Sequence, residues 1–243
     1  QFALAVLVQD GAHNLLFSDP KVNDFTSQWL CAYPIFQDNR VYRPYHLKHH
    51  RFTETKDDPD LSLSAPFPIK KDSFYRKIFR DLTGITGYKR YSQALNSILN
   101  TEAKNSKEKL NKVWHKIHGF LITNTIIFLM ISIFFHWSLF FLLWWLPAFT
   151  YYSLIIRIRN IAEHSVTPGN NNFDNTRTTL TNPLVRFLMA PHRVNYHLEH
   201  HLFMMCPWYN LPKAHSMMIE NGYEDRMCIA NSYRSVLMKA VSA

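Results

Sequence analysis

The histidines of this 243-residue chain fall into short clusters, and their spacing is the feature that could do chemistry. Two clusters share the spelling His-x-x-His-His, at residues 46–50 and 197–201. In a helix, positions i, i+3 and i+4 lie on one face, so we expect each cluster to direct three imidazoles at a single point. Three imidazoles on a buried face are costly unless a metal or hydrogen bonds occupy them. This pattern predicts metal ligands at His46, His49, His50, His197, His200 and His201.

Two thinner clusters place a side-chain amide four residues before a histidine. Gln9 precedes His13 and Asn160 precedes His164, so each pair would share a helical face. A single histidine is more often an ordinary core or surface residue, and these two become candidate ligands only beside the doubled pattern. The other histidines have no partner at ligand spacing, and we expect structural roles for His115, His118, His136, His192 and His215.

The number and type of these ligands limit the choice of metal. A closed zinc site needs about four ligands and a catalytic one about three. Eight histidines and two amides are therefore enough for two ions with open positions. Imidazole suits zinc, copper, iron and nickel, so the ligand type alone does not choose between them. The three cysteines have no Cys-x-x-Cys spacing, which indicates neither a disulfide framework nor a thiolate metal site.

A long uncharged segment separates the second cluster from the third. Residues 119–156 contain no Asp, Glu, Lys or Arg, and about 20 apolar residues cross a bilayer once. We expect two crossings, from Gly119 to about Phe135 and from about Leu139 to Ile156, with the turn between them. Lys and Arg flank both outer ends but not the turn, so the positive-inside rule places the histidine clusters on the cytoplasmic side. The alternative is a buried helical hairpin of a soluble core.

The rest of the chain is polar and basic, with a mean hydropathy of −0.20 and a net charge of +9. Lys and Arg are scattered without a recognition motif, so nucleic acid is not an expected partner. Anionic membrane lipids or an acidic electron-donor protein account for the charge. Residues 73–82 predict an amphipathic helix, either on the membrane surface or in a soluble fold. We expect a charged helix or linker at residues 101–111, and an Asn-rich loop at residues 167–182.

With these clusters arranged around an apolar hairpin, the chain resembles the membrane-bound fatty acid desaturases and their hydroxylase relatives, the histidine-box di-iron proteins. The likeness covers nearly the whole chain, and its motifs lie at residues 11–17, 45–50, 57–60, 159–164, 195–203 and 207–212. The resemblance implies an all-α fold, in which a multi-pass helical membrane domain of about four spans lies under a cytosolic helical cap that holds two irons. The N-terminal spans would be truncated in this sequence.

A single desaturase domain is therefore expected over residues 1–243. Residues 1–8 are too few to cross a bilayer and would be the end of a truncated span. The remaining parts are a cytosolic region with the first two histidine boxes at 9–118, the transmembrane hairpin at 119–156, and a second cytosolic region with the third box at 157–243.

The resemblance also implies a ligand set. The iron ligands would be His13, His46, His49, His50, His164, His197, His200 and His201. Asn160 resembles the family position that approaches an iron through water, and no catalytic residue separate from the ligands is implied. Carboxylates commonly orient metal-bound histidines, and the candidates for that role are Asp10, Asp57, Asp58 and Asp60. For the three around Pro59, a solvated turn is the alternative.

Two positions depart from the family pattern. Met204 replaces a proline that commonly follows the third box, which we interpret as a packing detail. Gln9 stands where the first box usually begins with histidine. Its amide oxygen is a weaker donor than imidazole and could be a weak ligand. Alternatively, Gln9 hydrogen-bonds nearby and water completes the site, or the chain is a catalytically impaired homologue.

The function implied is the oxygen-dependent introduction of a double bond into an acyl chain, in an integral membrane protein with its active site on the cytoplasmic face. Breaking an aliphatic C–H bond needs an oxidant that a cofactor supplies. Dioxygen would be the co-substrate and a ferredoxin or cytochrome b5 type protein the electron donor. The substrate would be an acyl lipid, an acyl-CoA or an acyl-carrier protein.

Two other functions remain open from the sequence. One is a hydroxylase or ketolase on the same scaffold, which would act on an acyl chain, a sphingolipid or a carotenoid. The other is a zinc-dependent membrane hydrolase. No His-Glu-x-x-His occurs, and Asn160-x-x-Glu163-His164 is one residue short of the His-x-x-Glu-His zinc signature.

Overall fold

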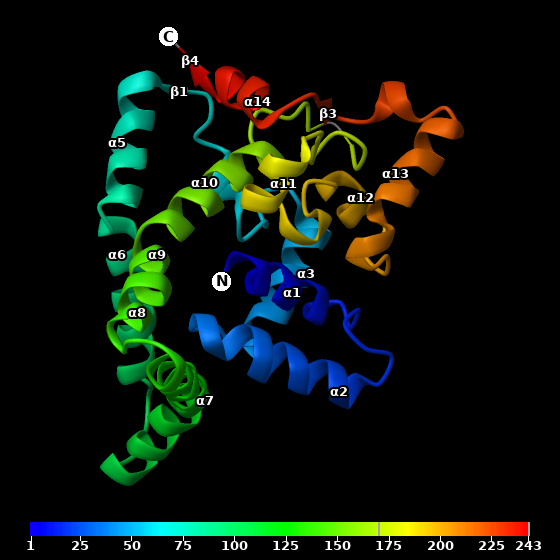
Figure 1. Cartoon of the computed structure of the whole chain (residues 1–243). Helices are drawn as coiled ribbons and strands as arrows, with labels where there is room; N and C mark the ends of the chain where they lie inside the picture. Colours follow the sequence, from blue (N-terminus) through cyan, green and yellow to red (C-terminus); the bar gives the residue numbers. More distant parts are fainter. Residues whose placement is uncertain (170, 243) are drawn as a thin grey trace.

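The structure is a computed structural model that describes residues 1–169 and 171–242, and most of it is helical (Figure 1). The α-helices are α1 (Phe2–Ala12), α2 (Pro20–Phe25), α3 (Asn39–Phe52), α4 (Leu61–Ser64), α5 (Lys71–Leu82), α6 (Ile85–Leu99), α7 (Ser106–Phe134), α8 (Ser138–Phe140), α9 (Leu146–Phe149), α10 (Tyr151–His164), α11 (Pro183–Met189), α12 (His197–Leu202), α13 (Leu211–Glu220) and α14 (Tyr233–Ala240). The π-helices are η1 (Thr26–Ala32) and η3 (Phe141–Trp145). The 3-10 helices are η2 (Tyr33–Ile35), η4 (Pro191–Arg193), η5 (Trp208–Asn210) and η6 (Glu224–Arg226).

Two pairs of short parallel strands join distant parts of the chain. Strand β1 (Ile69–Lys70) pairs with β4 (Val241–Ser242), and β2 (Thr178–Thr179) pairs with β3 (Ile229–Ala230). The loop predicted at residues 167–182 is therefore only partly correct, because Thr178 and Thr179 are buried in β2. Threonine is β-branched and suits a strand, but two residues are too short a run to give a pattern in the sequence. Asn170, within that loop, lies outside the described residues.

The predicted apolar hairpin is present. Helix α7 covers the first predicted crossing, and the continuous helical segment 138–164 covers the second. Both are long and apolar enough to cross a membrane by length and composition. The chain turns between Phe134 and Ser138, where the turn was predicted. Residues 106–111 of the predicted charged connector form the first turns of α7, which Asn105 caps by accepting a hydrogen bond from the Glu108 N–H at 2.9 Å.

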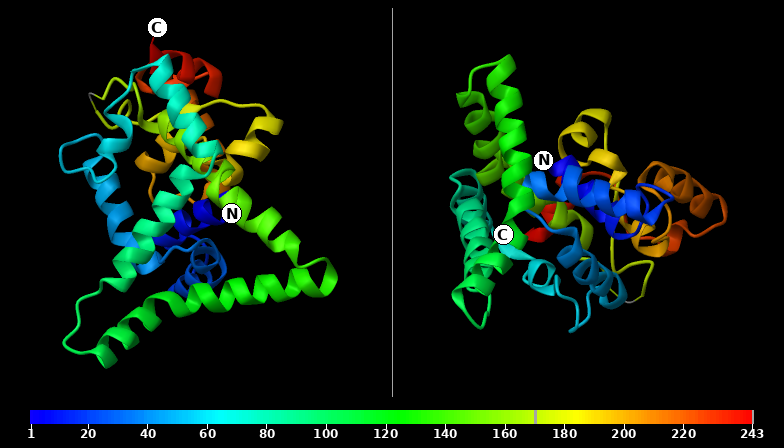
Figure 2. Two further views of the ribbon diagram at one scale, coloured as in Figure 1. Left: turned by 90° about the vertical axis from the view of Figure 1, so that its left-hand side faces the viewer. Right: turned by 90° about the horizontal axis from the view of Figure 1, so that it is seen from below.

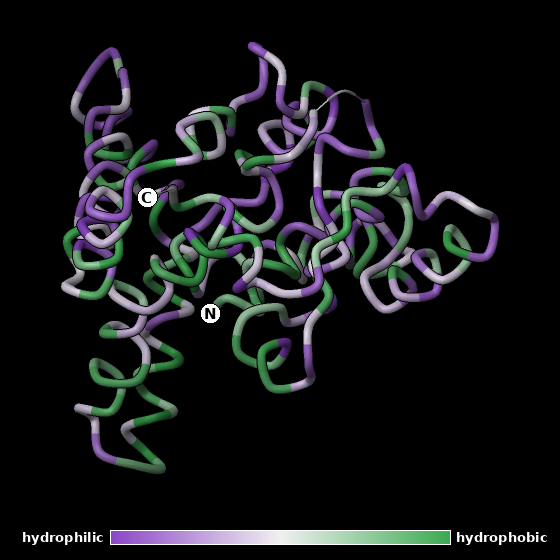
Figure 3. Tube along the Cα trace, turned by 90° about the horizontal axis from the view of Figure 1, so that it is seen from above, coloured by the Kyte–Doolittle hydropathy of each residue, from purple (hydrophilic) through white to green (hydrophobic). Residues whose placement is uncertain are grey.

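The two helical segments of the hairpin lie on one side of the molecule and have largely exposed apolar surfaces. Figure 2 shows α7 along one edge, with α5–α6 and α8–α10 rising from its two ends and meeting the rest of the fold, and Figure 3 shows how strongly hydrophobic the hairpin is. Only 17% of the most apolar window of α7 and 28% of that of segment 138–164 is buried. A core hairpin would be mostly buried, so these exposed apolar surfaces suit a lipid environment better than water.

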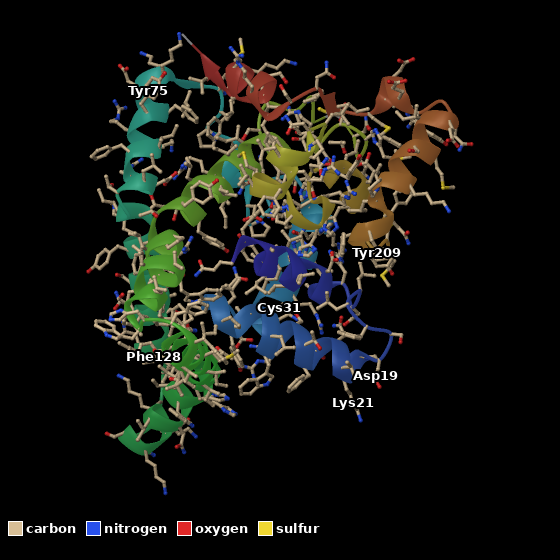
Figure 4. All side chains as sticks on the ribbon, viewed as in Figure 1. Asp19, Lys21, Cys31, Tyr75, Phe128 and Tyr209 are labelled. Carbon is tan, nitrogen blue, oxygen red and sulfur yellow. The ribbon has the colours of Figure 1, made fainter. Side chains whose placement is uncertain are left out.

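The predicted amphipathic helix is also present, as α5. Its residue Phe74 is buried in a cluster with Ile161 and Val236, which joins α5 to α10 and α14. Tyr75 and Phe79 are exposed on the other side of α5 (Figure 4 labels Tyr75). The helix therefore packs one apolar stripe on the protein and presents aromatic side chains outward, next to the apolar hairpin.

A close contact fixes α7 against the remainder of the fold. A Cβ atom added at Gly119 would overlap the ring of Tyr33, which is buried in η2. The Tyr33 ring is held in place because its hydroxyl accepts a hydrogen bond from Arg40 at 3.1 Å and its edge packs on Trp29 at a centroid distance of 5.0 Å. A glycine is thus required for α7 to approach this closely.

We predict that Gly119→Val lowers the free energy of unfolding by about 1–3 kcal/mol, the usual cost of overpacking. Thermal unfolding of the detergent-solubilised protein measures it. The control is Ile126→Val on the same helix, where the side chain is 50% exposed and little should change. Equal stability of the two variants would show that α7 can move away from η2 without cost.

Candidate metal centre

Helix α3 carries the second histidine box into the centre of the fold. Asp38 caps this helix, and its side chain accepts a hydrogen bond from the Arg40 N–H at 3.0 Å. His46 and His49 are buried, and His50 is partly buried. The third box lies on the short helix α12, so the prediction that both boxes are helical is confirmed.

The ends of α1 and α10 bring in the two thinner clusters. His13 directly follows α1, and His164 is the last residue of α10; each is 5% exposed. Helix α1 lies close to η1, because a Cβ atom at Gly11 would overlap the Ser27 side chain. The four helices that bear the boxes therefore converge from widely separated parts of the sequence.

Eight histidines meet there and form two groups, within each of which the ligand nitrogens lie within 4.8 Å of one another. The first histidine group consists of His13, His46, His50 and His200, and the second histidine group of His49, His164, His197 and His201. In the first group, the Nε2 atom of His13 lies 3.0 Å from that of His46. In the second, the Nε2 atom of His197 lies 2.9 Å from that of His164. All eight histidines singled out in the sequence are thus brought together.

The expectation that each box directs its three imidazoles at one point is wrong. On α3, His46 and His50 belong to the first group and His49 to the second, while on α12 His197 and His201 belong to the second and His200 to the first. The reason is helix geometry: at about 100° per residue, i+3 and i+4 point to opposite sides of residue i. Each box therefore gives an i, i+4 pair to one group and a single histidine to the other.

The donor set of both groups fits metal ions. Burial lowers the pKa of His13 to about 4, helped by the positive charge of Arg43. Burial and the neighbouring imidazoles hold the pKa values of His197 and His200 well below the usual range. These imidazoles are therefore neutral at pH 7, which is the form that binds a metal. Nitrogen lone pairs about 3 Å apart suit a shared cation, and all-imidazole groups are compatible with iron as well as zinc or copper.

Two carboxylates fix the orientation of residues in the groups. Asp58 is buried and its Oδ1 lies 2.8 Å from Nδ1 of His49, which leaves Nε2 free to face the second group. Burial opposes the charge on Asp58, but hydrogen bonds from His49 and from two backbone N–H groups outweigh it and lower the pKa of this carboxyl. Asp60 is a more distant neighbour, 3.8 Å from the same Nδ1, and accepts a hydrogen bond from the Tyr45 hydroxyl.

The other two carboxylates named from the sequence point elsewhere. Asp57 is exposed on the turn. Asp10 is buried and accepts a hydrogen bond from the backbone N–H of Trp208, while burial raises its pKa to about 7. Asp10 thus connects α1 to the segment after the third box.

The structure adds a contact that sequence reasoning missed. Glu199, inside the third box, is fully buried, and its Oε1 lies 2.6 Å from Nδ1 of His215 on α13. Its Oε2 accepts a hydrogen bond from Thr178 of β2. This carboxylate therefore anchors α12 at a position between His197 and His200, one from each histidine group. The sequence signal was its place within His-Leu-Glu-His-His, whereas its partner, 16 residues away, could not be read from spacing.

A buried polar network connects the two groups. The Nε2 of Gln9 lies 2.7 Å from Nε2 of His200, and the Oε1 of Gln9 accepts a hydrogen bond from Arg159 at 3.2 Å. Arg159 forms an ion pair with Glu163 at 2.5 Å, and the other oxygen of Glu163 lies 3.6 Å from Nε2 of His197. Gln9, Arg159, Glu163 and Asn160 all line a cavity of about 100 Å³ beside the histidines.

The remaining histidines lie apart from the groups. His136 is in the hairpin turn, where it bonds to the Ser138 hydroxyl at 2.8 Å. His118 packs on Trp29, and His192 packs on Trp208. His115 stacks on His118. His215, with its bond to Glu199, contacts the centre indirectly.

The fold is helical, with two groups of four histidines compatible with metal binding and two apolar helices long enough to cross a membrane. Residues 1–229 match the family described as fatty acid desaturase, and the chain belongs to that family. The chain is also 26% identical over 242 residues to dihydrorhizobitoxine desaturase of Bradyrhizobium elkanii, in a match that covers 92% of this chain and 66% of that relative. The family predicted from the motifs is therefore confirmed.

We predict that Asp58→Asn lowers the metal affinity of the second group by about 10–100-fold, because loss of the carboxylate leaves the His49 ring without its orienting partner. Titration with a competing chelator, followed by elemental analysis, measures it. Asp57→Asn is the matched control one residue away, on the exposed side of the turn, and should leave the affinity unchanged. The assignment of Asp58 is contradicted if both variants hold metal as tightly as the parent.

Proposed function

We propose that this protein is an acyl desaturase that uses dioxygen and two irons, one held by each histidine group. The observation that carries the proposal is the pair of four-histidine groups formed from three boxes and the end of α10. Bound iron would supply the oxidant that removes hydrogen from an unactivated carbon. The ligands proposed are the eight histidines of the two groups, with Asn160 acting on the second group through water.

The protein residues have separate tasks around the two groups. Asp58 and Glu199 hold the boxes in register, so that the imidazoles keep their positions during turnover. The ion pair between Arg159 and Glu163 closes one side of the small cavity and gives the cavity a hydrogen-bonded wall. A preorganised wall of this kind costs no reorganisation at the moment of reaction.

An apolar pocket next to the centre suits the substrate. The pocket has a volume of about 510 Å³ and lies between α3, α6 and α7. Tyr42 lines both this pocket and the small cavity, and its ring stacks on His46 at a centroid distance of 5.1 Å. Lys116 also lines the pocket and offers a positive charge to an anionic head group. We infer that an acyl chain lies in this pocket with its reacting carbons at Tyr42.

A second pocket is larger but is less suited to this role. It has a volume of about 860 Å³ beside α13 and is rich in methionine, including Met204 and Met217. In the described part of the chain it shares no lining residue with the cavity at the histidines. We therefore assign the substrate to the smaller pocket, because Tyr42 lines both that pocket and the cavity at the histidines.

The proposed setting is a membrane. The exposed hairpin would cross the bilayer, and the polar regions on both sides of it in the sequence, 9–118 and 157–243, would form one cytosolic cap with the histidines inside. The whole would be a multi-pass membrane domain. Electrons would come from a separate ferredoxin or cytochrome b5 type donor, for which the net charge of +9 favours an acidic partner.

A hydroxylase or ketolase on the same scaffold is the nearest alternative, because it would use the same metal centre. The relative from Bradyrhizobium elkanii is named a desaturase, which supports dehydrogenation. It is named for dihydrorhizobitoxine and not for a fatty acid, so our assignment of an acyl chain rests on the family and the apolar pocket. Mass spectrometry of products from the purified, iron-loaded protein distinguishes the reactions: loss of two hydrogens indicates a desaturase, and gain of one oxygen would overturn the proposal.

We predict that His201→Ala abolishes dioxygen-dependent product formation and lowers the iron content, because it removes a ligand of the second group. His136→Ala is the control, since His136 lies in the hairpin turn. It should retain both iron and turnover. Equal inactivation of the two variants, or a parent protein with stoichiometric zinc and negligible iron, would contradict the proposed centre.

We predict that Ala94→Phe shifts product formation toward shorter acyl chains, because Ala94 lines the apolar pocket and a larger side chain fills part of it. Leu95→Phe is the control on the exposed side of α6. A competition assay with an equimolar mixture of chain lengths measures the shift. If both variants keep the parent's chain-length profile, the acyl chain lies elsewhere.

A further inference from the structure

Gln9, one of the two positions where this chain departs from the family pattern, has defined contacts in the structure. Gln9 lies in the last turn of α1 and is 3% exposed. Its amide nitrogen faces His200 of the first histidine group at 2.7 Å, and its amide oxygen faces Arg159 at 3.2 Å. The side chain therefore lies within reach of the first group.

The direction of this amide is determined by Arg159. A guanidinium has five N–H donors and no acceptor, so the atom opposite it must be the amide oxygen. A reversed amide would turn its NH2 group toward the guanidinium and leave a buried donor without an acceptor, which is unfavourable. Arg159 itself cannot turn away easily, since Glu163 binds its Nε at 2.5 Å and its guanidinium packs over the Phe2 ring at 5.5 Å.

In this orientation the amide nitrogen of Gln9, which cannot bind a metal, faces the histidines. The NH2 group of an amide carries hydrogens and has no lone pair to give to a metal. The oxygen, which could be a ligand, is engaged by Arg159. The first group is therefore left with four imidazoles, the same number as the second. Gln9 offers the first histidine group a hydrogen-bond donor and not a fifth ligand.

We propose that Gln9 does not bind the metal and instead donates a hydrogen bond to a small anionic or oxygen-containing molecule entering the first histidine group. Arg159 and Glu163 hold its amide in the orientation this requires. The cavity of about 100 Å³ that these three residues line has room for such a molecule. It borders the first group at His46 and the second group at His49, His164 and His197, so the molecule would reach the first group from the side of His46. The inference rests on the proposed function only in that a metal occupies the first group.

The probe is azide, a small anion that accepts hydrogen bonds, added to the full-length iron-loaded protein and followed by its absorption band. We expect Gln9→Leu to keep the iron content of the parent and to bind azide about tenfold more weakly, the loss that corresponds to one hydrogen bond of about 1.4 kcal/mol. Gln28→Leu is the matched control. Gln28 is also buried, but its oxygen accepts a hydrogen bond from the Asn39 N–H at the start of α3, and azide affinity should not change.

A second variant tests the role of Arg159. In Arg159→Met the amide of Gln9 is free to reverse, so azide binding should weaken to the level of Gln9→Leu, and the double variant should be no weaker than either. If Arg159→Met does not fold, Gln9→Leu and its control still decide the proposal. Loss of half of the iron in Gln9→Leu would overturn it, because position 9 would then be a ligand. Unchanged azide affinity in Gln9→Leu would also overturn it.

A negative result for the role of Gln9 can be told apart from a failure of the proposed desaturase function. The metal of the parent protein is identified first by elemental analysis, and product formation is measured separately. A parent that holds another metal or makes no desaturated product contradicts the proposed function. The comparison of Gln9→Leu with Gln28→Leu can then be made with cobalt as the bound metal, and its result applies to Gln9 alone.

Discussion

The interaction on which the structure depends is the packing of eight imidazoles against one another in two largely buried groups. Each group places nitrogen atoms about 3 Å apart in a region that excludes water. Polar groups buried without partners are costly, and a cation in each group would remove that cost by accepting the lone pairs of four imidazoles. Metal binding and folding would then be coupled, since an unfolded chain has no preformed site.

The rest of the fold can be understood from this requirement. The helices α1, α3, α10 and α12 converge on the two groups, and buried carboxylates hold the boxes from outside. The ion pair of Arg159 and Glu163 lies beside the groups, where a buried pair is tolerated because each partner has further hydrogen bonds or polar contacts. The apolar hairpin and α5 lie to one side and present hydrophobic surface, which suits delivery of an apolar substrate to a polar centre.

Much of this arrangement could be predicted from local patterns in the sequence. The helical boxes, the two apolar helices and their turn, the amphipathic α5 and the family all follow from periodicity, charge or motif spacing. Contacts between distant segments could not be predicted in this way. The division of His49 and His50 between different groups depends on where the partner helices lie, and the bond from Glu199 to His215 depends on how α13 packs. The same holds for Gln9, whose amide orientation is set by a residue 150 positions away.

The most direct test of this account is the location of the metal ions by anomalous X-ray diffraction, recorded above and below the iron absorption edge on crystals of the iron-loaded protein. The account predicts two iron peaks per chain, one within the first histidine group and one within the second, with the side-chain amide nitrogen of Gln9 directed toward the first. A single peak shared by the two groups, or a first peak bound through the Gln9 oxygen, would contradict it.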